Sequence, residues 1–502
     1  MPLKDNDNSL LHRSVDALRW NYIGVTVRMG LQFFLGILLA RILGPEPFGI
    51  VAIAWLVLGV GNLVGDFGLA SALVQQETIT KKDIRYVFTM QMLSGLIMTL
   101  FIIFTAPYIA QFFKSASAAF VIQVMGCLFL IQAAGQTSTS LLRRQLDFKK
   151  LQAYNVASYL LSYLLLGLPL ALTGYGLWAL VAAQLSQSLL YSLMVNFRNP
   201  HSWKPSLEAD SEGMLTFGMK IMASNFTSWG ISNLDSVMIG RIFGPLSLGL
   251  YNRGMSLVAT PMNAFTSTLQ GVLFPAYARV NGNIENSRSA YIASVGLVAI
   301  ILVPLFSAVA AIPHTFTLAI YGEKWLKVAK LITPLAIAMP VNAILAMSGP
   351  LMAGLGKAGL DLFSQGLCVI ILVPVVLLAS NISLEAVAWG VLAVYVLRGI
   401  LVVYLAMRLV SGQLQQILKA LLGPVILGCV AAIIASTLDV VVSGLTPMIS
   451  VSVVMSVTAT ATILLLLWQG QNLLCAETRF VLMKMVDKFP KPLASFVMGW
   501  GV

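Results

Sequence analysis

Charged residues are scarce in this chain. Asp, Glu, Lys and Arg make up 10% of the 502 residues, against about 25% in a soluble domain. Hydrophobic residues make up 58%, so most of the chain is not built to meet water. The four cysteines have neither metal nor redox spacing, which excludes a cysteine framework. We expect them to act as small hydrophobic residues in helix packing.

Catalytic motifs are also absent. The chain has no Walker A motif, no GxSxG, no HExxH and no CxxC. Residues 354–357 (GLGK) resemble a phosphate loop, but they lack the preceding strand and the trailing Ser or Thr. No segment between the apolar stretches is long enough for a soluble catalytic domain. We therefore expect no enzyme activity, no cofactor and no metal site.

Apolar stretches long enough to cross a bilayer recur along the whole chain. A helix needs about 20 apolar residues to span a core of about 30 Å. We count 14 such windows, near 20–43, 48–74, 86–112, 118–140, 152–173, 176–197, 216–242, 247–273, 290–313, 329–353, 359–379, 384–407, 417–438 and 447–469. The sequence therefore predicts an all-α integral membrane protein with about 14 transmembrane helices.

The net charge of +12 could indicate nucleic acid, but its distribution argues otherwise. With 14 helices, the loops on the same side of the membrane as the N-terminus hold 21 of the 31 Lys and Arg, and the loops on the opposite side hold six. The positive-inside rule then predicts that both termini are cytoplasmic. We expect the loops at 75–85, 141–151 and 198–214 in the cytoplasm, and those at 41–47, 314–328 and 439–446 outside. We expect no nucleic-acid partner.

A short irregular sequence occurs twice, 200 residues apart. Residues 40–50 read ARILGPEPFGI and residues 240–250 read GRIFGPLSLGL. A Gly-Pro pair ends a helix, because proline fixes its own φ and disfavours helix in the residue before it. The two copies fall after the first and the seventh window, so the repeat unit has six helices. An even number predicts parallel repeats, with both Gly-Pro turns on the external side.

This repeat sets the predicted domain organisation: two six-helix lobes around a central cavity, plus two further helices. The bounds are 1–19 for a cytoplasmic N-terminus, 20–197 for the first lobe, 198–215 for a cytoplasmic linker, 216–407 for the second lobe, 408–470 for the extra helices and 471–502 for a cytoplasmic tail. The tail mixes basic and apolar residues, as amphipathic segments on membrane surfaces do.

Polar residues inside the windows are the candidates for a site, because a charge in the bilayer needs a partner or a water-filled cavity. In the first window Asn21, Gly24, Arg28 and Gln32 are spaced to share one helix face. In the seventh, Asn225, Ser228, Ser232 and Asp235 also share one face, in register with the first. Such faces suit two walls of one cavity. Alternatively, small polar residues hold helices together.

Individual charges allow the same two interpretations. Asp66 in the second window could neutralise Arg28 in a packing ion pair. Asn252 and Arg253 begin a polar stripe in the eighth window. Arg253 could line the cavity, or its side chain could extend to the membrane interface. Lys220 lies near the predicted cytoplasmic end of the seventh window, where a lysine side chain usually extends to the membrane interface. Arg398 is mid-helix and predicted to face the bundle interior, but sequence distance gives it no partner.

These features, in this order, resemble a known family. The segments are LARILGPEPFGIVAIA at 39–54, LVGDFGLASALVQ at 63–75, LLRRQLDFKKL at 141–151, GYGLWALVAAQL at 174–185 and LDSVMIGRIFGPLSLGLYNRG at 234–254. Together they resemble the polysaccharide transporter family of the multidrug/oligosaccharidyl-lipid/polysaccharide superfamily. Wzx-type exporters of the colanic-acid or teichuronic-acid kind are the most similar.

The resemblance implies a two-lobed bundle that opens alternately to each side of a bacterial inner membrane. The implied substrate is an oligosaccharide linked through pyrophosphate to undecaprenol, moved outward for exopolysaccharide or lipopolysaccharide biosynthesis. It further implies membrane lipids and a polysaccharide polymerase with chain-length machinery as partners. A cationic cavity would hold the pyrophosphate, and Arg28 and Arg253 match this pattern in residue type and helix.

The substrate-binding residues expected from both arguments are Arg28, Arg253, Gln32, Asn225, Ser228, Asn252, Asp66 and Asp235. One alternative is a multidrug or metabolite cation antiporter of the same fold, which would favour acidic residues in its cavity. Another is a membrane-embedded polymerase or glycosyltransferase, which usually has a large external loop with catalytic residues. Here the longest predicted external loop, 314–328, has one acidic residue.

Overall fold

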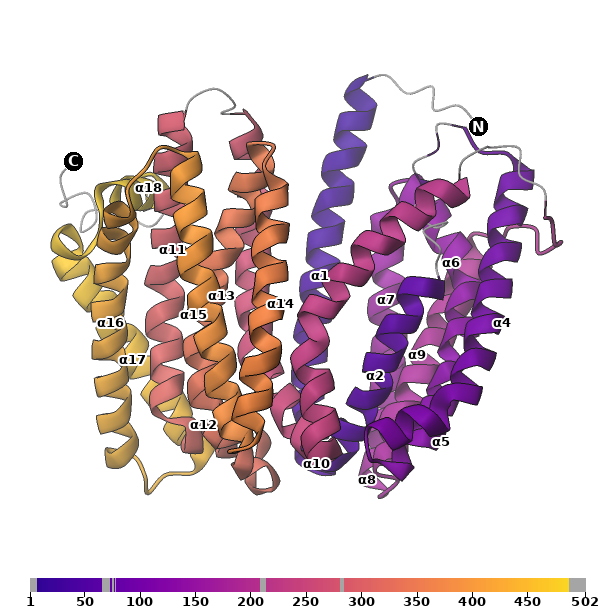
Figure 1. The fold of residues 1–502 in the computed structure, drawn as a ribbon, viewed down its shortest axis with the longest axis horizontal. Coiled ribbons are helices and arrows are strands. Elements are labelled where there is room, and N and C mark those ends of the chain that lie inside the picture. The colour runs from indigo at the N-terminus through magenta and orange to yellow at the C-terminus, as the bar shows by residue number, and fades with distance from the viewer. Residues whose placement is uncertain are drawn as a thin grey trace. The chain divides into compact units, whose positions relative to one another are not determined.

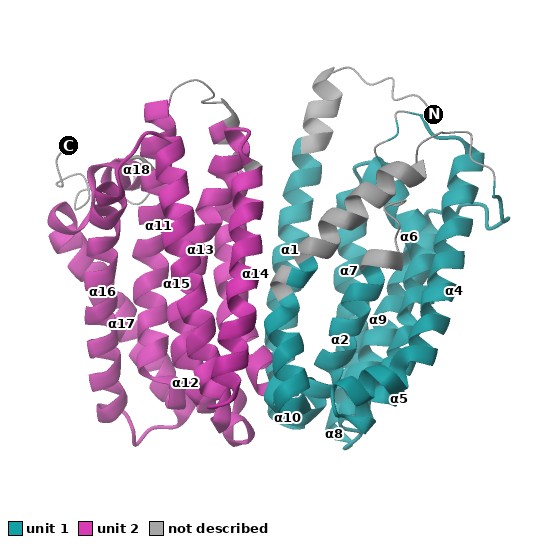
Figure 2. Cartoon of the chain, viewed as in Figure 1, with its two compact units in different colours: residues 1–249 teal, residues 250–502 magenta. Residues whose placement is uncertain are grey.

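The computed structural model describes the backbone of residues 7–65, 73–74, 76, 78–207, 214–279 and 284–486. Within these ranges the side chains of 7–14, 63–65, 214–228, 231–232, 272, 274–276, 278–279, 358 and 484–486 are not described. Every regular element in the described ranges is a helix (Figure 1). The chain forms two compact units, residues 1–249 and 250–502 (Figure 2).

Unit 1 contains the first predicted repeat. Its helices are α1 (Asp7–Leu43), α2 (Pro45–Gly65), α4 (Lys81–Phe112), α5 (Ala116–Gly126), α6 (Leu128–Arg144), α7 (Phe148–Ser162), the π-helical η1 (Tyr163–Gly167), α8 (Leu168–Leu172) and α9 (Leu177–Arg198). The helix α10 (Met214–Arg279) begins in this unit and bends at Gly244. Because α1 begins at Asp7, much of the predicted polar N-terminus is helical.

Unit 2 continues from α10. Its other helices are α11 (Ile284–Ala311), α12 (Pro313–Tyr321), the 3₁₀ helix η2 (Glu323–Val328), α13 (Ala329–Gly354), α14 (Ala358–Ser380), α15 (Leu384–Leu409), α16 (Leu414–Val441), α17 (Pro447–Leu473) and α18 (Ala476–Val486). The buried helices are α11, which packs against α13 and α16, and α13 itself. The segment 314–328, predicted to be a loop, is helical, and Trp325 within it is fully buried.

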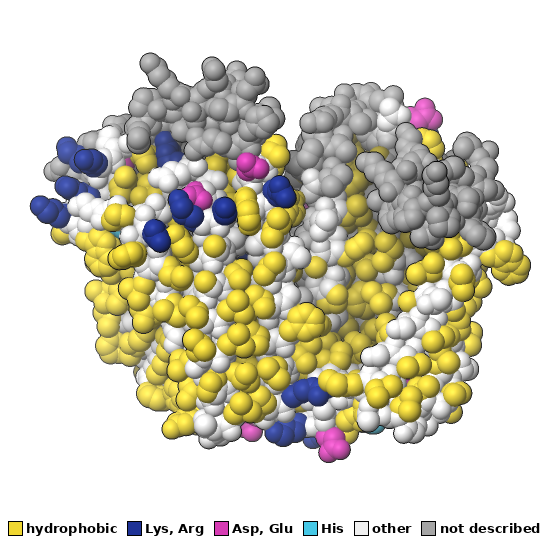
Figure 3. All heavy atoms as spheres, turned by 180° about the vertical axis from the view of Figure 1, so that it is seen from behind, with side chains coloured by type: hydrophobic (Ala, Val, Ile, Leu, Met, Phe, Trp, Pro, Cys, Tyr) yellow, Lys and Arg dark blue, Asp and Glu magenta, His cyan; other side chains and the backbone are white. Residues whose placement is uncertain are grey.

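Twelve helices in the described residues are long and apolar enough to cross a membrane. They match twelve of the 14 predicted windows. The other two windows, 216–242 and 247–273, lie in α10 on either side of Gly244. Figure 3 shows the face opposite to that of Figure 1. Hydrophobic side chains cover the middle of the helices there, and Lys and Arg gather mainly toward one end. The chain is therefore a multi-pass membrane protein.

The predicted tail contributes to unit 2. Helix α18 packs against α11, and Leu482 and Met483 contact a buried cluster formed by Ile300, Leu427 and Leu474. The side chain of Thr478 lies directly against Gly296, where a Cβ would overlap it. One face of this segment therefore packs on protein. Residues 487–502 lie outside the described part of the chain.

The two Gly-Pro turns have the same backbone conformation. Gly44 has φ 78° and Gly244 has φ 79°, the left-handed region in which glycine is favoured. Gly44 ends α1, its N–H donating to the carbonyl of Ala40 (3.1 Å), and Pro45 begins α2. Glycine just after a helix and proline at the first position of the next are the expected termination signals. The predicted helix break is confirmed in both copies.

These two turns also touch each other, within unit 1. Gly49 lies against the carbonyl oxygen of Pro245, and Gly249 lies against that of Pro45. A Cβ at either glycine would overlap the opposite carbonyl. Such reciprocal contact is the pattern of a two-fold axis, and it puts both turns at the same end of the helices. This agrees with parallel repeats and excludes turns on opposite faces.

The first leg of α10 is fastened to unit 1 by further contacts. Trp229 packs against Gly59 of α2, and the Nη1 of Arg241 donates to the carbonyl of Phe112 at the end of α4 (2.5 Å). The first compact unit therefore extends to Gly249 and includes the first leg of α10.

The described half of the predicted linker at 198–215 is held in place by side chains. The Oγ of Ser138 lies within hydrogen-bond distance of Asn196 Oδ1 (2.9 Å), the Asn199 carbonyl (3.0 Å) and His201 Nδ1 (3.1 Å). The ring of His201 packs against those of Phe88 and Trp203, which also contact each other. Its Nε2 is buried without a partner, and burial lowers the pKa of His201 below 6.5.

We expect Gly49→Ala to lower the free energy of unfolding by about 1–3 kcal/mol, because the new methyl group overpacks the contact with Pro245. Thermal unfolding of the purified protein in detergent would measure this loss, and Gly249→Ala should behave alike. Gly30→Ala is the matched control, because no atom lies within 4 Å of a Cβ there. Equal melting temperatures for Gly49→Ala and Gly30→Ala would contradict the contact.

We also expect His201 to make stability depend on pH. Its folded-state pKa is lowered, so the unfolded state binds the proton more readily as pH falls through 6.5. The stabilising contribution is full above this value and decreases below it. Melting temperatures from pH 7.5 to 5.5 should fall less for His201→Gln than for the wild type. Identical pH dependence in both proteins would argue against the buried neutral ring.

Candidate functional site

The predicted polar face of α1 divides into two parts. Asn21 Oδ1 accepts a hydrogen bond from Gln152 Nε2 of α7 (2.8 Å), and Gly24 lets the Gln152 side chain lie directly on the helix. This part is a helix-packing surface, the simpler of the two interpretations. Arg28 follows one turn later and is half-buried, with its Nε buried and without a hydrogen-bond partner. Gln32 is exposed.

The remaining predicted residues are only partly described. Asp66 and the side chains of Asn225 and Ser228 lie outside the described residues, so the Arg28–Asp66 ion pair stays a hypothesis. Asp235 is buried, and its Oδ1 accepts from the main-chain N–H of Ser236 (2.7 Å).

Two predicted residues lie in unit 2. Asn252 and Arg253 are half-buried in the second leg of α10. The main-chain carbonyl of Arg253 accepts from the hydroxyl of Tyr321 in α12 (3.1 Å). The backbone of Arg253 is therefore in contact with α12. Arg28 and Asp235 belong to unit 1.

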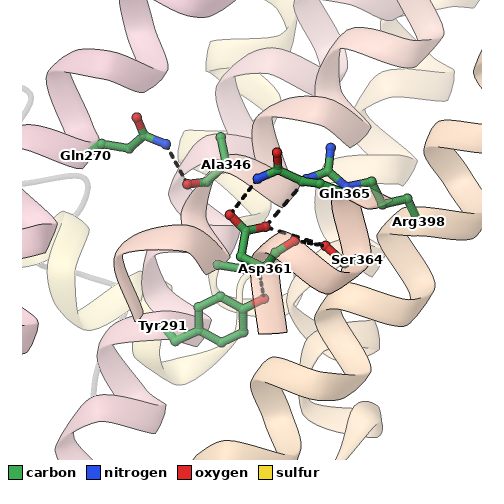
Figure 4. A network of polar contacts seen from close by, with 8 residues as sticks. Gln270, Tyr291, Ala346, Asp361, Ser364, Gln365 and Arg398 are labelled. Carbon is green, nitrogen blue, oxygen red and sulfur yellow. Dashed lines mark hydrogen bonds and ion pairs between the residues drawn. The ribbon is translucent and has the colours of Figure 1, made fainter. Parts of the chain in front are cut away.

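Arg398 has a partner that sequence reasoning missed. Its Nη2 lies 3.5 Å from Oδ1 of Asp361, and the two side chains are 17% and 30% exposed. Gln365 Nε2 donates to the other carboxylate oxygen of Asp361 (2.9 Å), as Figure 4 shows. The Nε of Arg398 is buried without a partner. The pair joins α14 to α15, and the mostly buried position agrees with the predicted inward orientation of Arg398.

Other polar contacts of unit 2 lie around this pair (Figure 4). Gln270 Nε2 donates to the carbonyl of Ala346 (2.6 Å), which joins α10 to α13. The hydroxyls of Tyr291 and Ser348 are 2.8 Å apart, which joins α11 to α13. Each contact satisfies a polar group inside the helix bundle, as a low-dielectric interior requires.

Unit 1 contains a polar pocket that the sequence analysis did not predict. It has a volume of about 300 Å³ and lies among α2, α4 and α6. The polar residues that line it are Asn62, Gln91, Gln132 and Gln136. The four-residue spacing of Gln132 and Gln136 places both on one helix face, which was the available signal.

No group of three metal-ligating side chains occurs among the described residues. The four cysteines are free thiols.

Sequence comparison gives relatives of one kind. The teichuronic acid biosynthesis protein TuaB of Bacillus subtilis (strain 168) is 25% identical over 383 residues, covering 74% of this chain and 78% of TuaB. The succinoglycan biosynthesis transport protein ExoT of Rhizobium meliloti (strain 1021) is 28% identical, covering 66% and 65%. The lipopolysaccharide biosynthesis protein WzxC of Escherichia coli (strain K12) is 20% identical, covering 87% and 89%.

Two solved structures share the fold. The lipid II flippase MurJ, in an inward closed conformation, matches with a TM-score of 0.69 and 12% identity, covering 88% of this chain and 99% of MurJ. An inward-facing multidrug resistance MATE family transporter of the MOP superfamily matches with a TM-score of 0.57 and 14% identity, covering 78% and 98%. These likenesses confirm the predicted all-α membrane fold.

The sequence model of a family described as "Polysaccharide biosynthesis protein" matches residues 38–330. This range includes both Gly-Pro turns and all five segments on which the predicted resemblance rests. Since the match spans more than half of the chain and the relatives agree with it, the chain belongs to the polysaccharide biosynthesis protein family, as a polysaccharide transporter of the Wzx type.

Proposed function

We propose that this protein is a flippase for an undecaprenyl-pyrophosphate-linked oligosaccharide. It moves the substrate from the cytoplasmic to the outer leaflet by alternating access, for extracellular polysaccharide or lipopolysaccharide biosynthesis. The observation that carries the proposal is the family match over residues 38–330. Relatives named for teichuronic acid and succinoglycan biosynthesis, the second as a transport protein, support it.

The physical problem of such a substrate is its pyrophosphate. An unpaired ion in hydrocarbon costs far more than most binding contacts return, so the anion needs charged partners along its path. Arginine keeps its charge and offers a fork of donors that fits phosphate oxygens. Arg28 has an unpartnered buried Nε, and Arg253 is half-buried in α10. We assign both to the pyrophosphate.

The main alternative is a cation antiporter, since a MATE transporter shares the fold. A shared fold does not identify a substrate. The family match and the named relatives favour the lipid-linked saccharide. The Asp361 carboxylate, which a cationic drug could use, already contacts Arg398.

The charge distribution supports a location and an orientation in the membrane. The protein crosses the bacterial inner membrane many times, with both termini in the cytoplasm, because 21 Lys and Arg lie on that side of the predicted topology and six on the other. Its partners are membrane lipids, the lipid-linked oligosaccharide and the polymerase that receives it. It acts as a transporter and not as an enzyme, so the covalent bonds of the substrate remain unchanged.

Deleting the gene should cause the lipid-linked oligosaccharide to accumulate in the inner leaflet and should abolish the extracellular polysaccharide. Lipid extraction with mass spectrometry would identify the accumulating compound, and the wild-type gene should reverse the effect. A strain that lacks the first glycosyltransferase of the same pathway is the control and should accumulate nothing. Normal polysaccharide with new sensitivity to cationic drugs would instead support the antiporter.

Arg28→Ala should leave the protein level near normal and reduce export at least about tenfold, because a charge-assisted hydrogen bond contributes about 1.5–3 kcal/mol. Arg28→Lys should retain partial export, since it keeps the charge but not the fork. Arg19→Ala is the control, because Arg19 is exposed on the same helix. Immunoblots and polysaccharide yield would measure both quantities.

The competing packing role for Arg28 has a different signature. If Arg28 only neutralises Asp66, Arg28→Ala should lower the protein level. Adding Asp66→Asn should then restore both level and export, because removing both partners costs less than leaving one charge buried. Normal export by Arg28→Ala at a normal protein level would exclude Arg28 from the mechanism.

A further inference from the structure

The polar pocket of unit 1 has an unusual lining. Four carboxamides, those of Asn62, Gln91, Gln132 and Gln136, line about 300 Å³ together with the ring of Phe129. Among the residues that the structure describes, no charged side chain lines it. A volume near 300 Å³ is at the lower end of the range for small-molecule sites.

Gln91 supplies the evidence that this pocket is suited to a ligand. The residue is 3% exposed, and its Oε1 accepts a hydrogen bond from the hydroxyl of Thr137 (2.6 Å). Its Nε2 is buried and has no hydrogen-bond partner in the protein. A buried amide N–H without a partner costs about 1–3 kcal/mol, so an acceptor that enters the pocket would recover this energy.

Gln132 and Gln136 extend the polar wall by one helical turn along α6. Both are half-buried, and neither side chain takes part in the hydrogen bonds found among the described residues. Their amide groups are therefore available to a ligand. Each carboxamide offers two donors and an acceptor with two lone pairs.

The walls of the pocket are held at close distance by Gly95. A Cβ at this position would lie 2.8 Å from Cβ of Ala133 and 2.9 Å from the carbonyl oxygen of Phe129. Helix α4 can therefore approach α6 only because residue 95 is glycine. A fixed pocket binds with less loss of conformational entropy than one that must form on binding.

The depth of the pocket suits a group that enters from one side of the membrane. Gln91 lies ten residues after Lys81, where α4 begins, and Gln136 lies eight residues before Arg144, where α6 ends. At 1.5 Å per residue these are about 15 and 12 Å from the basic helix ends. The pocket is thus within the half of the bilayer next to those ends, which are cytoplasmic in the proposed topology.

The chemistry of this lining selects its ligand. A pyrophosphate requires positive charge, which the described lining residues do not supply, and a polyprenyl chain would leave the amides unsatisfied. A saccharide fits, because each hydroxyl can both donate to and accept from a carboxamide. We infer that this pocket binds the saccharide part of the lipid-linked substrate. The inference rests on the proposed function.

The test compares two probes on the purified full-length protein: undecaprenyl pyrophosphate, and the undecaprenyl-pyrophosphate-linked oligosaccharide extracted from the deletion strain. Binding titrations by native mass spectrometry would give both dissociation constants. We expect the wild type to bind the sugar-bearing probe more tightly. The double variant Gln132→Leu/Gln136→Leu should lose at least about tenfold of this preference, with affinity for undecaprenyl pyrophosphate unchanged within about twofold.

The matched control is Gln123→Leu. Gln123 is a half-buried glutamine of the same unit that donates to the carbonyl of Ile103 (3.3 Å) and does not line the pocket. It should keep the full preference. The single variants Gln132→Leu and Gln136→Leu serve as the test if the double variant does not fold, and each should lose part of the preference.

The outcomes separate the two proposals. Full preference in the pocket variants, or equal affinity of the wild type for both probes, would overturn the saccharide site and leave the flippase intact. Failure of the wild type to bind either probe would overturn the proposed function itself. Loss of affinity for both probes in the pocket variants would overturn the inference, because it would indicate a general disturbance of unit 1.

Discussion

A lipid bilayer offers no hydrogen-bond partners, and this one constraint governs most of what the chain does. Backbone groups must be satisfied within each helix, so twelve long helices dominate the described structure. Polar side chains must find partners on neighbouring helices. The Gln152–Asn21, Gln270–Ala346 and Tyr291–Ser348 contacts are solutions of this kind. Each joins two helices, so the polar groups also determine which helices pack together.

Under the same constraint, a buried polar atom without a partner in the protein is a candidate for contact with a ligand. The Nε of Arg28, the Nε of Arg398 and the Nε2 of Gln91 are all buried and unpaired. Two of these are cationic, and one is a neutral amide in a pocket with three further amides. A substrate with an anionic centre and a neutral hydroxyl-rich part needs both kinds of partner.

The sequence predicted features that depend on neighbouring residues better than contacts between residues far apart in the chain. The helix break at Gly44-Pro45 and its copy at Gly244-Pro245 were predictable, because glycine and proline act on the neighbouring backbone alone. The pairing of Arg398 with Asp361 was not, because the two are 37 residues apart and only the packing of α14 on α15 brings them together. The segment 314–328 was misassigned as a loop because its helices are short. The spacing of Gln132 and Gln136 was visible in the sequence, but Gln91, which lines the same pocket, comes from another helix.

The reciprocal contact between the two turns has a consequence for how the duplicated halves could diverge. Gly49 and Gly249 each meet a main-chain carbonyl of the other copy, not a side chain. The residues between the turn and the glycine are Glu46, Pro47 and Phe48 in one copy and Leu246, Ser247 and Leu248 in the other, with no identity between them. A contact made by backbone atoms tolerates such change, provided that the spacing between proline and glycine is kept. The contact therefore requires that residues 49 and 249 remain glycine and that the three-residue spacing is kept, whereas the side chains between the turn and the glycine can differ between the two copies.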